Sequence, residues 1–170
     1  MAIAISVRQY LNSNDIEYDS FEHRRTGSSS ESARASLVPG DNLAKGVVLR
    51  NQEGYLLTVL PSSQMADLDK ISDLIHLPVA IALEEEIYAL FPDCENGAVP
   101  PIGAAYSMQT IVDESLDLVN DVYFEAGDHR TLIHLSGSQF FKLMRKSSHA
   151  SICFESQAGH GEMDFVYFGA

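Results

Sequence analysis

Apolar residues recur along this 170-residue chain with two different periods, and their alternation predicts interleaved helices and strands. In 67–75, the apolar residues fall on one side of a helix. Apolar runs at 43–50 and 55–60 predict two buried strands, which Gly54 would join into an antiparallel hairpin and Pro61 would end.

The same two periods place the remaining elements. Helices are predicted over 6–16, 31–35, 67–75, 84–90 and 139–145. Strands are predicted over 18–22, 43–50, 55–60, 79–83, 104–108, 110–112, 121–124 and 130–135. The segment 79–83 is also compatible with a turn.

Short polar signals mark where several of these elements begin. The serines at 28–30 offer N-caps for the second helix, and Ser136 with Gln139 forms a capping box before the last one. Residues 126–128 predict a hairpin turn. Helices interleaved with tight hairpins predict an α+β fold, a single domain with a mixed, mostly antiparallel sheet and flanking helices.

We expect this domain to cover residues 1–150. Residues 151–170 are predicted to be a C-terminal extension that packs on the body, with 165–168 as an extended segment.

Residues 91–103, which we call the proline loop, cannot form a helix. Gly97 and Gly103 free the backbone, whereas Pro100 and Pro101 remove two N–H donors and fix φ. The loop is therefore expected to be stiff, with exposed carbonyls and apolar walls. Loops of this kind on a rigid scaffold often carry binding sites, although a plain turn has the same composition.

Composition places the chain among ordinary globular proteins. Hydrophobic residues make up 45% and charged residues 21%, which argues against disorder. No apolar run is long enough to cross a membrane, and no basic segment precedes the first apolar residues as in a signal peptide. Cys94 and Cys153 are too few and too far apart for a metal cluster, so we expect free thiols and a cytoplasmic location.

The net charge of −13 works against loose binding to nucleic acid, but the charge is uneven. Between residues 51 and 129, Lys70 is the single basic residue against fifteen acidic ones. The other basic residues lie in two blocks, at 8–50 and 130–146. They could form one positive face, or they could be scattered.

Three residues are candidates for chemistry. Lys45 begins an apolar strand beside Gly46, and its ammonium could hold a carboxylate, phosphate or ester oxygen, or could simply be solvated. His129 follows the predicted turn and is better placed for a cleft than His134, which should point elsewhere. His23 could line a pocket rim or face solvent.

Other chemistries find little support. The histidines have no metal-binding spacing, so no metal or other cofactor is expected, and no GxSxG elbow is present. Dinucleotide and P-loop fingerprints are also missing. Asp93 and Glu95 beside Cys94 should raise the pKa of its thiol, which predicts a packing role.

Three segments together resemble the YbaK/ProX family, the aminoacyl-tRNA editing domains related to the insertion domain of bacterial prolyl-tRNA synthetase. They are Ala44-Lys45 before an apolar strand, the sequence FPDCExGAVPPxG at 91–103, and VYFEAGDHRTLI at 122–133. The resemblance covers roughly residues 3–146. It implies a mixed α/β domain that needs no metal and hydrolyses the ester joining a wrong amino acid to tRNA.

The resemblance also implies roles for single residues. Lys45 matches the family's pocket lysine, and His129 falls where relatives carry a histidine close to the substrate; both are expected to be catalytic. The expected substrate-binding residues are His23, Gly97, Ala98, Val99, Pro100, Pro101, Gly103 and Gly127. Gly46 departs from the Thr or Asn of other members, which bears on the amino acid accepted.

We therefore expect a stand-alone trans-editing deacylase that removes Ala, Cys or Ser from tRNA(Pro). Its partners would be the acceptor end of mischarged tRNA and prolyl-tRNA synthetase or another synthetase, and the chain would be a monomer or a weak homodimer. The alternative is a non-catalytic binding or regulatory module that keeps the pocket for an amino acid, a nucleotide or a protein. Hydrolysis of another small ester or thioester is also open.

Overall fold

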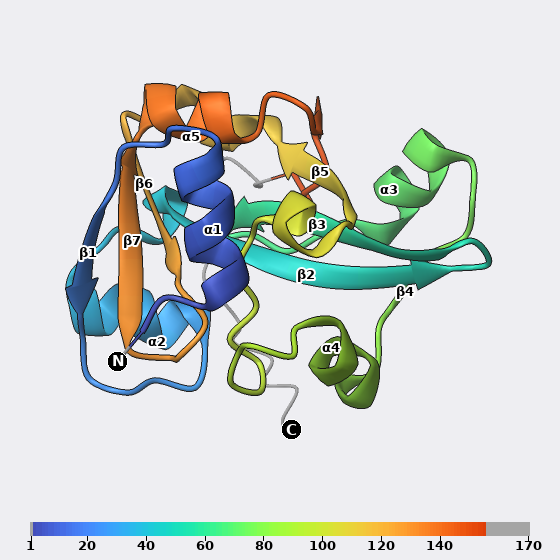
Figure 1. Ribbon diagram of the computed structural model, residues 1–170. Coiled ribbons are helices and arrows are strands. Elements are labelled where there is room, and N and C mark those ends of the chain that lie inside the picture. The colour runs from blue at the N-terminus through green and yellow to red at the C-terminus, as the bar shows by residue number, and fades with distance from the viewer. Residues whose placement is uncertain (1, 156–170) are drawn as a thin grey trace, which may run out of the picture.

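Eight strands pair into one sheet in the part of the chain that the computed structural model describes, residues 2–155 (Figure 1). The strands are β1 (Asp19–Glu22), β2 (Leu43–Asn51), β3 (Gly54–Pro61), β4 (Ala80–Ile81), β5 (Gln109–Asp113), β6 (Asp121–Glu125), β7 (Thr131–Ser136) and β8 (Ser148–Ala150). Their order is β1-β7-β6-β2-β3-β5-β8, and β4 pairs with β2. The helices are α1 (Ile5–Ser13), α2 (Ser29–Ser36), α3 (Leu68–Ile75), α4 (Glu84–Leu90) and α5 (Gly137–Leu143).

The sheet is mixed, as the sequence predicts. The pairs β1–β7, β2–β3, β2–β4 and β6–β7 are antiparallel, whereas β2–β6, β3–β5 and β5–β8 are parallel. The predicted hairpin is the pair β2–β3, in which Asn51 faces Gly54 across the turn. Gly54 has a φ of 132°, which side chains rarely adopt, so glycine suits this turn. The predicted α+β fold is confirmed.

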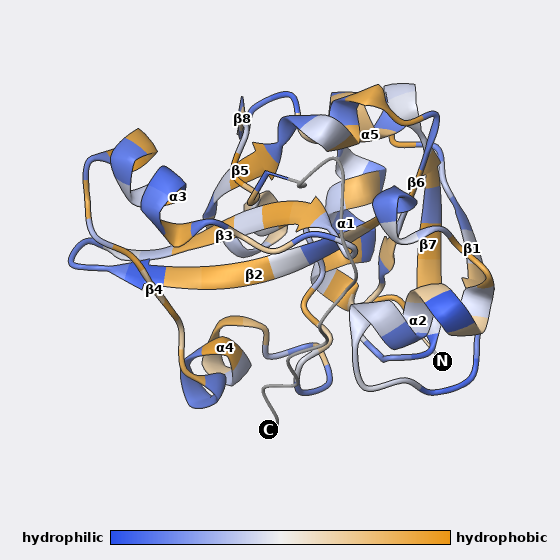
Figure 2. Cartoon of the chain, turned by 180° about the vertical axis from the view of Figure 1, so that it is seen from behind, coloured by the Kyte–Doolittle hydropathy of each residue, from blue (hydrophilic) through white to orange (hydrophobic). Residues whose placement is uncertain are grey.

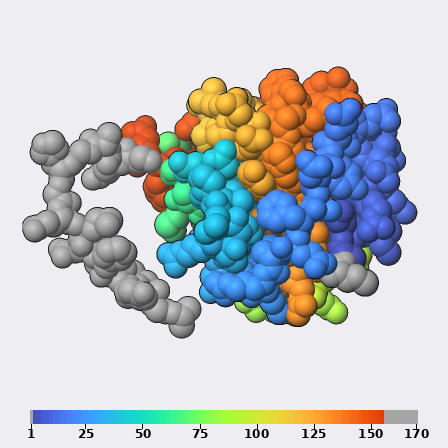
Figure 3. Space-filling model, turned by 90° about the vertical axis from the view of Figure 1, so that its left-hand side faces the viewer, coloured from blue at the N-terminus to red at the C-terminus, as the bar shows by residue number. Residues whose placement is uncertain are grey.

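Helices cover both faces of the sheet (Figure 2). Alternation along β2 separates the two faces: Ala44 and Val48 lie in the main core with α1 and α5, whereas Leu43 and Leu49 face the other way. Leu43 packs with Ala33 of α2, and Leu49 packs beneath α3. On the α2 side, the N-terminal segments lie beside the segment around β7 (Figure 3).

The strand predicted at 104–108 is wrong, because Gly103–Tyr106 forms the short 3₁₀ helix η2. The Ile102 carbonyl accepts a hydrogen bond from Ala105 N–H, and the Gly103 carbonyl accepts one from Met108 N–H. These local bonds coil the chain directly after the prolines. Alternation of apolar residues does not reveal them.

The predicted hairpin turn joins β6 to β7, but it is longer than expected. The loop is closed by a hydrogen bond of 2.9 Å from Ala126 N–H to the Thr131 carbonyl. Asp128 Oδ1 accepts from the N–H groups of Arg130 and Thr131. His129 therefore lies inside the turn, with a φ of 56°, and not at the start of the strand as predicted.

The capping box predicted for the last helix is half present. Ser136 Oγ accepts from Gln139 N–H, but the Gln139 side chain accepts from Glu17 N–H instead of returning to Ser136. Ser28 caps α2 through Glu31 N–H, as predicted. Each cap satisfies a backbone donor that the helix leaves open.

The described start of the C-terminal extension contacts the body. Ile152 is buried, its N–H donates to Asp113 Oδ2, and its carbonyl accepts from Asp67 N–H. The extended segment predicted at 165–168 lies outside the described residues.

Candidate functional site

The proline loop is held by apolar packing, while most of its backbone polar groups are left unpaired. Ala98, Pro100 and Pro101 are buried. From Gly97 to Pro101, Ala98 N–H is the one backbone group that hydrogen-bonds to another residue of the described chain, the Glu95 carbonyl at 3.0 Å. Unpaired carbonyls on a stiff support are suited to contacting a ligand.

The loop packs directly on β2 at Gly46. A Cβ built on Gly46 would lie 3.1 Å from Val99 Cγ1 and 3.5 Å from Pro101 Cα. Because successive residues of a strand point to opposite faces, Lys45 extends from the other face. The predicted lysine and loop therefore flank β2 on opposite sides.

The sheet is interrupted at this part of β2. On one edge, β2 pairs with β6 only at Leu43 and Ala44, and with β4 only at Leu49 and Arg50. Residues 45–47 have no ladder partner on this edge among residues 2–155, and we call them the open stretch of β2.

The peptide groups of Gly46 point toward this open edge. The Val48 carbonyl accepts from Ala82 N–H on the β4 side, whereas the carbonyls of Leu43 and Val47 accept from groups of the β3 side. Alternate residues of an antiparallel strand direct their N–H and C=O to the same edge, so Gly46 shares the direction of Val48. One donor and one acceptor thus face the gap beside the proline loop.

Lys45 lies on the face of the sheet that α2 covers. Ala44 pairs with Phe124, and the residues that follow these two are Lys45 and Glu125. Leu132, the β7 partner of Glu125, packs in the same cluster as Leu43, so Lys45 and Glu125 extend from the same face. Within residues 2–155 the Lys45 ammonium has no hydrogen bond or ion pair, and burial lowers its pKa.

His129 contacts the middle of the proline loop, at Asn96 and Gly97. Its Nε2 lies 2.6 Å from the Asn96 carbonyl, and a Cβ on Gly97 would lie 3.7 Å from its Cε1. A carbonyl only accepts hydrogen bonds, so Nε2 carries the proton in this contact. The structure therefore brings His129 and the predicted loop together.

Gly103 and Gly127 serve close packing. A Cβ on Gly103 would lie 2.8 Å from the Met108 carbonyl oxygen. Gly127 has a φ of 118°, its carbonyl accepts from Glu95 N–H, and a Cβ there would lie 3.1 Å from Cys94 Sγ. Both glycines hold the ends of the proline loop against the body.

His23 directly follows β1 and lies beside a group of buried polar residues that sequence reasoning missed: Glu125, Ser32 and Thr26. Its Nε2 is 3.7 Å from Glu125 Oε1, and both side chains are buried. Glu125 Oε1 also accepts from the Ser32 hydroxyl, which contacts the Thr26 hydroxyl at 2.6 Å. A lone acid in the apolar run 122–126 was the available signal for Glu125.

The two basic blocks of the sequence meet near the loop. His23 N–H donates to the Arg130 carbonyl, which brings Arg24 and Arg25 close to Arg130, and Arg25 pairs with Glu95 at 2.7 Å. A cavity of about 560 Å³ at the tip of the loop is lined by Gly27, Asn96, Gly97 and residues of α4, including Glu84 and Glu85. The surroundings of the loop therefore carry both signs of charge.

Cys94 behaves as the sequence predicts. Burial raises the pKa of its thiol to about 12, and Asp93 contributes in the same direction. Its Sγ lies 3.3 Å from the Tyr106 hydroxyl. No cluster of three metal-binding side chains is found in residues 2–155, and no helix of that range has the length and apolar character of a membrane span.

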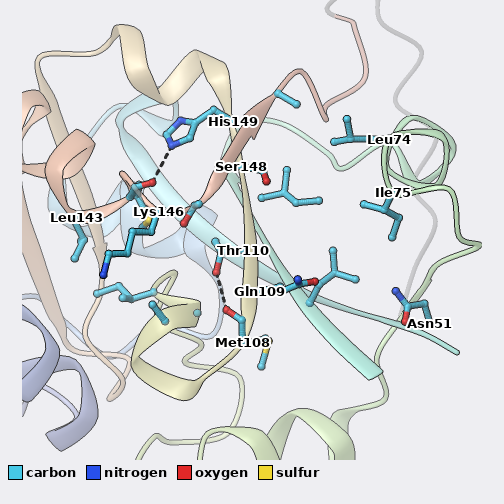
Figure 4. A pocket seen from close by; sticks show the side chains of 18 of the residues that line it. Asn51, Leu74, Ile75, Met108, Gln109, Thr110, Leu143, Lys146, Ser148 and His149 are labelled. Atoms are coloured by element: carbon cyan, nitrogen blue, oxygen red, sulfur yellow. Dashed lines mark hydrogen bonds between the residues drawn. The ribbon is translucent and has the colours of Figure 1, made fainter. Parts of the chain in front are cut away.

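A second cavity, of about 500 Å³, lies toward the β5–β8 side of the sheet (Figure 4). Gln109, Thr110, Lys146 and His149 line it together with apolar residues of α3. Of the predicted site residues, only Gly103 reaches it within the described chain. This cavity is therefore separate from the site around the open stretch.

Comparisons with known proteins show the family and the fold of the chain. Residues 23–143 match the family model described as aminoacyl-tRNA editing domain. A search of the curated proteins finds no match.

Solved structures share the fold. A candidate trans-editing enzyme for prolyl-tRNA synthetase superposes with a TM-score of 0.75 at 23% identity, over 89% of this chain and 97% of that one. A hypothetical protein reaches 0.78 at 18% identity, over 88% and 99% of the two chains. A candidate signal transduction protein from Marinobacter aquaeolei reaches 0.72 at 17% identity, over 91% of this chain but 31% of its own.

Proposed function

Because the chain belongs to the aminoacyl-tRNA editing domain family, we propose that it is a stand-alone trans-editing deacylase that hydrolyses the ester of mischarged tRNA. The observation that carries the proposal is the unpaired backbone of the proline loop beside the open stretch of β2. Of the two residues that the family resemblance singles out, His129 holds the loop through Asn96, and Lys45 extends from the other face of β2.

Hydrolysis of an aminoacyl ester requires few catalytic groups. An aminoacyl ester is already activated, so its hydrolysis requires a positioned water and donors for the developing oxyanion. Gly46 N–H is a backbone donor at the gap, and the loop carbonyls are acceptors for an α-ammonium group. Neither needs a cofactor.

The residues then take distinct roles. Lys45 holds the phosphate or ester end of the terminal adenosine, as a compact cation with three donors. Gly97 to Pro101, with Val99 packed on Gly46, limits the size of the amino acid side chain. His129 keeps the loop in place through Asn96 and lies near the ribose. His23 belongs to the buried wall behind Lys45.

We propose Ala, Cys or Ser on tRNA(Pro) as the substrate class. A rigid pocket excludes a larger cognate amino acid by size, which is the principle of double-sieve editing. The neighbour described as a candidate trans-editing enzyme for prolyl-tRNA synthetase supports the choice of tRNA, and its 23% identity leaves the amino acid to experiment.

The test is a deacylation screen with tRNA(Pro) charged with Ala, Cys or Ser, alongside other mischarged tRNAs. We expect turnover of at least one small amino acid and a loss of about 100-fold in Lys45→Ala, in the range of a lost charge-assisted contact. Lys146→Ala removes an exposed lysine from the distant cavity and serves as the matched control.

The second candidate is a non-catalytic binding module, favoured by the net charge of −13 and by Glu84 and Glu85 at the loop tip. It predicts binding of a free amino acid or nucleotide with no turnover of any mischarged tRNA. Wild-type activity that Lys45→Ala leaves unchanged would also contradict the assigned site.

A further inference from the structure

The Nδ1 atom of His23 is engaged by its backbone neighbour. Its Nδ1 lies 2.6 Å from the Arg24 carbonyl, and that oxygen only accepts, so Nδ1 carries the proton. In the neutral ring, Nε2 is then left with a free lone pair. The imidazole is thus fixed as a potential proton acceptor at Nε2.

The Nε2 lone pair is buried next to an equally buried carboxylate. The side chains of His23 and Glu125 are 2% and 8% exposed, and the distance of 3.7 Å between Nε2 and Oε1 is too long for a hydrogen bond. Neither His23 Nε2 nor Glu125 Oε2 has a hydrogen-bond partner among the described residues. Buried polar atoms without partners are rare and costly, and they mark functional sites in many structures.

Hydrogen bonds from α2 hold the carboxylate in place. The Ser32 hydroxyl donates to Glu125 Oε1, and the Thr26 hydroxyl lies 2.6 Å from Ser32 Oγ, where it can donate in turn. These hydrogen bonds engage Oε1 of Glu125, and Oε2 has no hydrogen-bond partner among the described residues. Glu125 is therefore oriented by neutral donors while one oxygen remains available.

The pair lies beside the open stretch of β2. Glu125 extends from the same face as Lys45, one position beyond the last β2–β6 pair. His129, the other histidine near the loop, already uses its Nε2 on the Asn96 carbonyl. The ring nitrogen that His129 leaves without this contact is Nδ1, whereas that of His23 is Nε2, which is buried beside Glu125.

We propose that His23, oriented by the Arg24 carbonyl and placed beside the Glu125 carboxylate, accepts at Nε2 the proton of the water that attacks the aminoacyl ester. This role rests on the proposed deacylase function. The water oxygen bonds to the ester carbonyl carbon while one water proton passes to Nε2. The carbon–oxygen bond to the ribose then breaks, Nε2 returns that proton to the ribose oxygen, and the free amino acid and tRNA leave.

The surroundings of Glu125 are consistent with a proton-handling role. Burial raises the pKa of its carboxyl group. The titratable groups that act on the Glu125 carboxyl besides His23 are Asp128 and His129 from the β6–β7 loop, and the neutral Ser32 of α2 donates to it. The two histidines favour the ionised carboxylate and Asp128 opposes it.

The test compares pH profiles of deacylation on the mischarged tRNA that the screen identifies. We expect His23→Gln to lose about 100-fold in kcat with little change in KM, the usual contribution of a general base. In Glu125→Gln, which keeps an acceptor for Ser32, we expect a loss of about 10-fold and a rising limb displaced to lower pH. His134→Gln is the control, because His134 also pairs with carboxylates but lies on β7 beside Asp19 and Asp121.

A second measurement does not depend on activity. Nitrogen-15 shifts of His23 should report the tautomer with the proton on Nδ1 and none on Nε2 at neutral pH. Wild-type kcat and an unchanged profile in both variants, or a proton on Nε2 in the neutral ring, overturns the role of His23. The deacylase function survives that result if Lys45→Ala is still inactive, whereas a wild-type chain without turnover overturns both.

Discussion

Gly46 and Val99 pack so closely that a methyl group on Gly46 would fit only if a neighbouring side chain moved. A Cβ on Gly46 would lie 3.1 Å from Val99 Cγ1 and 3.0 Å from Leu57 Cδ1. Strand and loop are both rigid here, since β2 is bonded to β3 and the loop contains two consecutive prolines. The Gly46–Val99 contact therefore sets the height of the loop above the sheet.

The substitution Gly46→Ala should move the loop. Val99 must shift by a few tenths of an ångström, so we expect a loss of about 1–3 kcal/mol in the free energy of unfolding. We also expect a changed ranking of Ala, Cys and Ser in the deacylation screen. Gly27→Ala is the control for the unfolding measurement, because a Cβ there meets only Glu31 Oε2 at an ordinary 3.5 Å. Equal stability and ranking in both variants would show that the contact does not define the pocket.

The substitution His129→Gln should loosen the loop. It removes the ring that reaches the Asn96 carbonyl, and it places a residue less suited to positive φ at 56°. We expect KM for mischarged tRNA to rise about tenfold, with a smaller effect on kcat, since the loss is mainly of positioning. His134→Gln should match the wild type. A selective fall in kcat with constant KM would instead favour direct participation of His129 in the reaction.

Both cysteines should resist alkylation in the folded protein. Burial raises the pKa of Cys94 and that of Cys153 to about 12, so the nucleophilic thiolate is scarce at pH 8. We expect iodoacetamide to leave both unmodified under native conditions and to modify both in denaturant, as read by mass spectrometry. Rapid native modification of Cys94 would contradict the packing role and point to a reactive thiol beside the loop.

Glu125 should make stability depend on pH. Its pKa is raised by burial above the ordinary value of 4.5, so the folded state favours the protonated form. The wild type therefore loses stability as the pH rises from about 4.5 through the pKa of the folded state. Glutamine does not ionise, so the stability of Glu125→Gln relative to wild type should increase between pH 4 and pH 8.

Urea unfolding at several pH values measures this difference. Glu53→Gln, at an exposed position of the β2–β3 turn, supplies the baseline for losing one surface carboxylate. A relative stability of Glu125→Gln that falls with increasing pH would mean that the carboxylate form is the one stabilised in the fold.

The elements that the sequence predicts well are those specified by neighbouring residues. The hairpin β2–β3 follows from two apolar runs around Gly54, and α3 follows from a helical apolar stripe in 68–75. The proline loop was identifiable because proline and glycine act on the local backbone. The family resemblance predicted that Lys45 and His129 act beside it; His129 contacts the loop, whereas Lys45 extends from the other face of β2.

What escaped prediction depends on distant partners. The open stretch of β2 exists because its register with β6 and β4 leaves a gap, and no local pattern encodes that register. The contact of Glu125 with Ser32 joins residues far apart in sequence. The η2 coil depends on hydrogen bonds that a strand-like composition at 104–108 does not indicate.

The short pairing between β2 and β6 also affects the order in which the chain folds. Two residue pairs, Leu43–Tyr123 and Ala44–Phe124, connect the β1-β7-β6 half of the sheet to the other half. Pairings between distant segments pay the entropy of closing a long loop, whereas the hairpins β2–β3 and β6–β7 pay little. We therefore expect the hairpins β2–β3 and β6–β7 to form first and to dock late, so that the gap beside Gly46 takes shape late in folding.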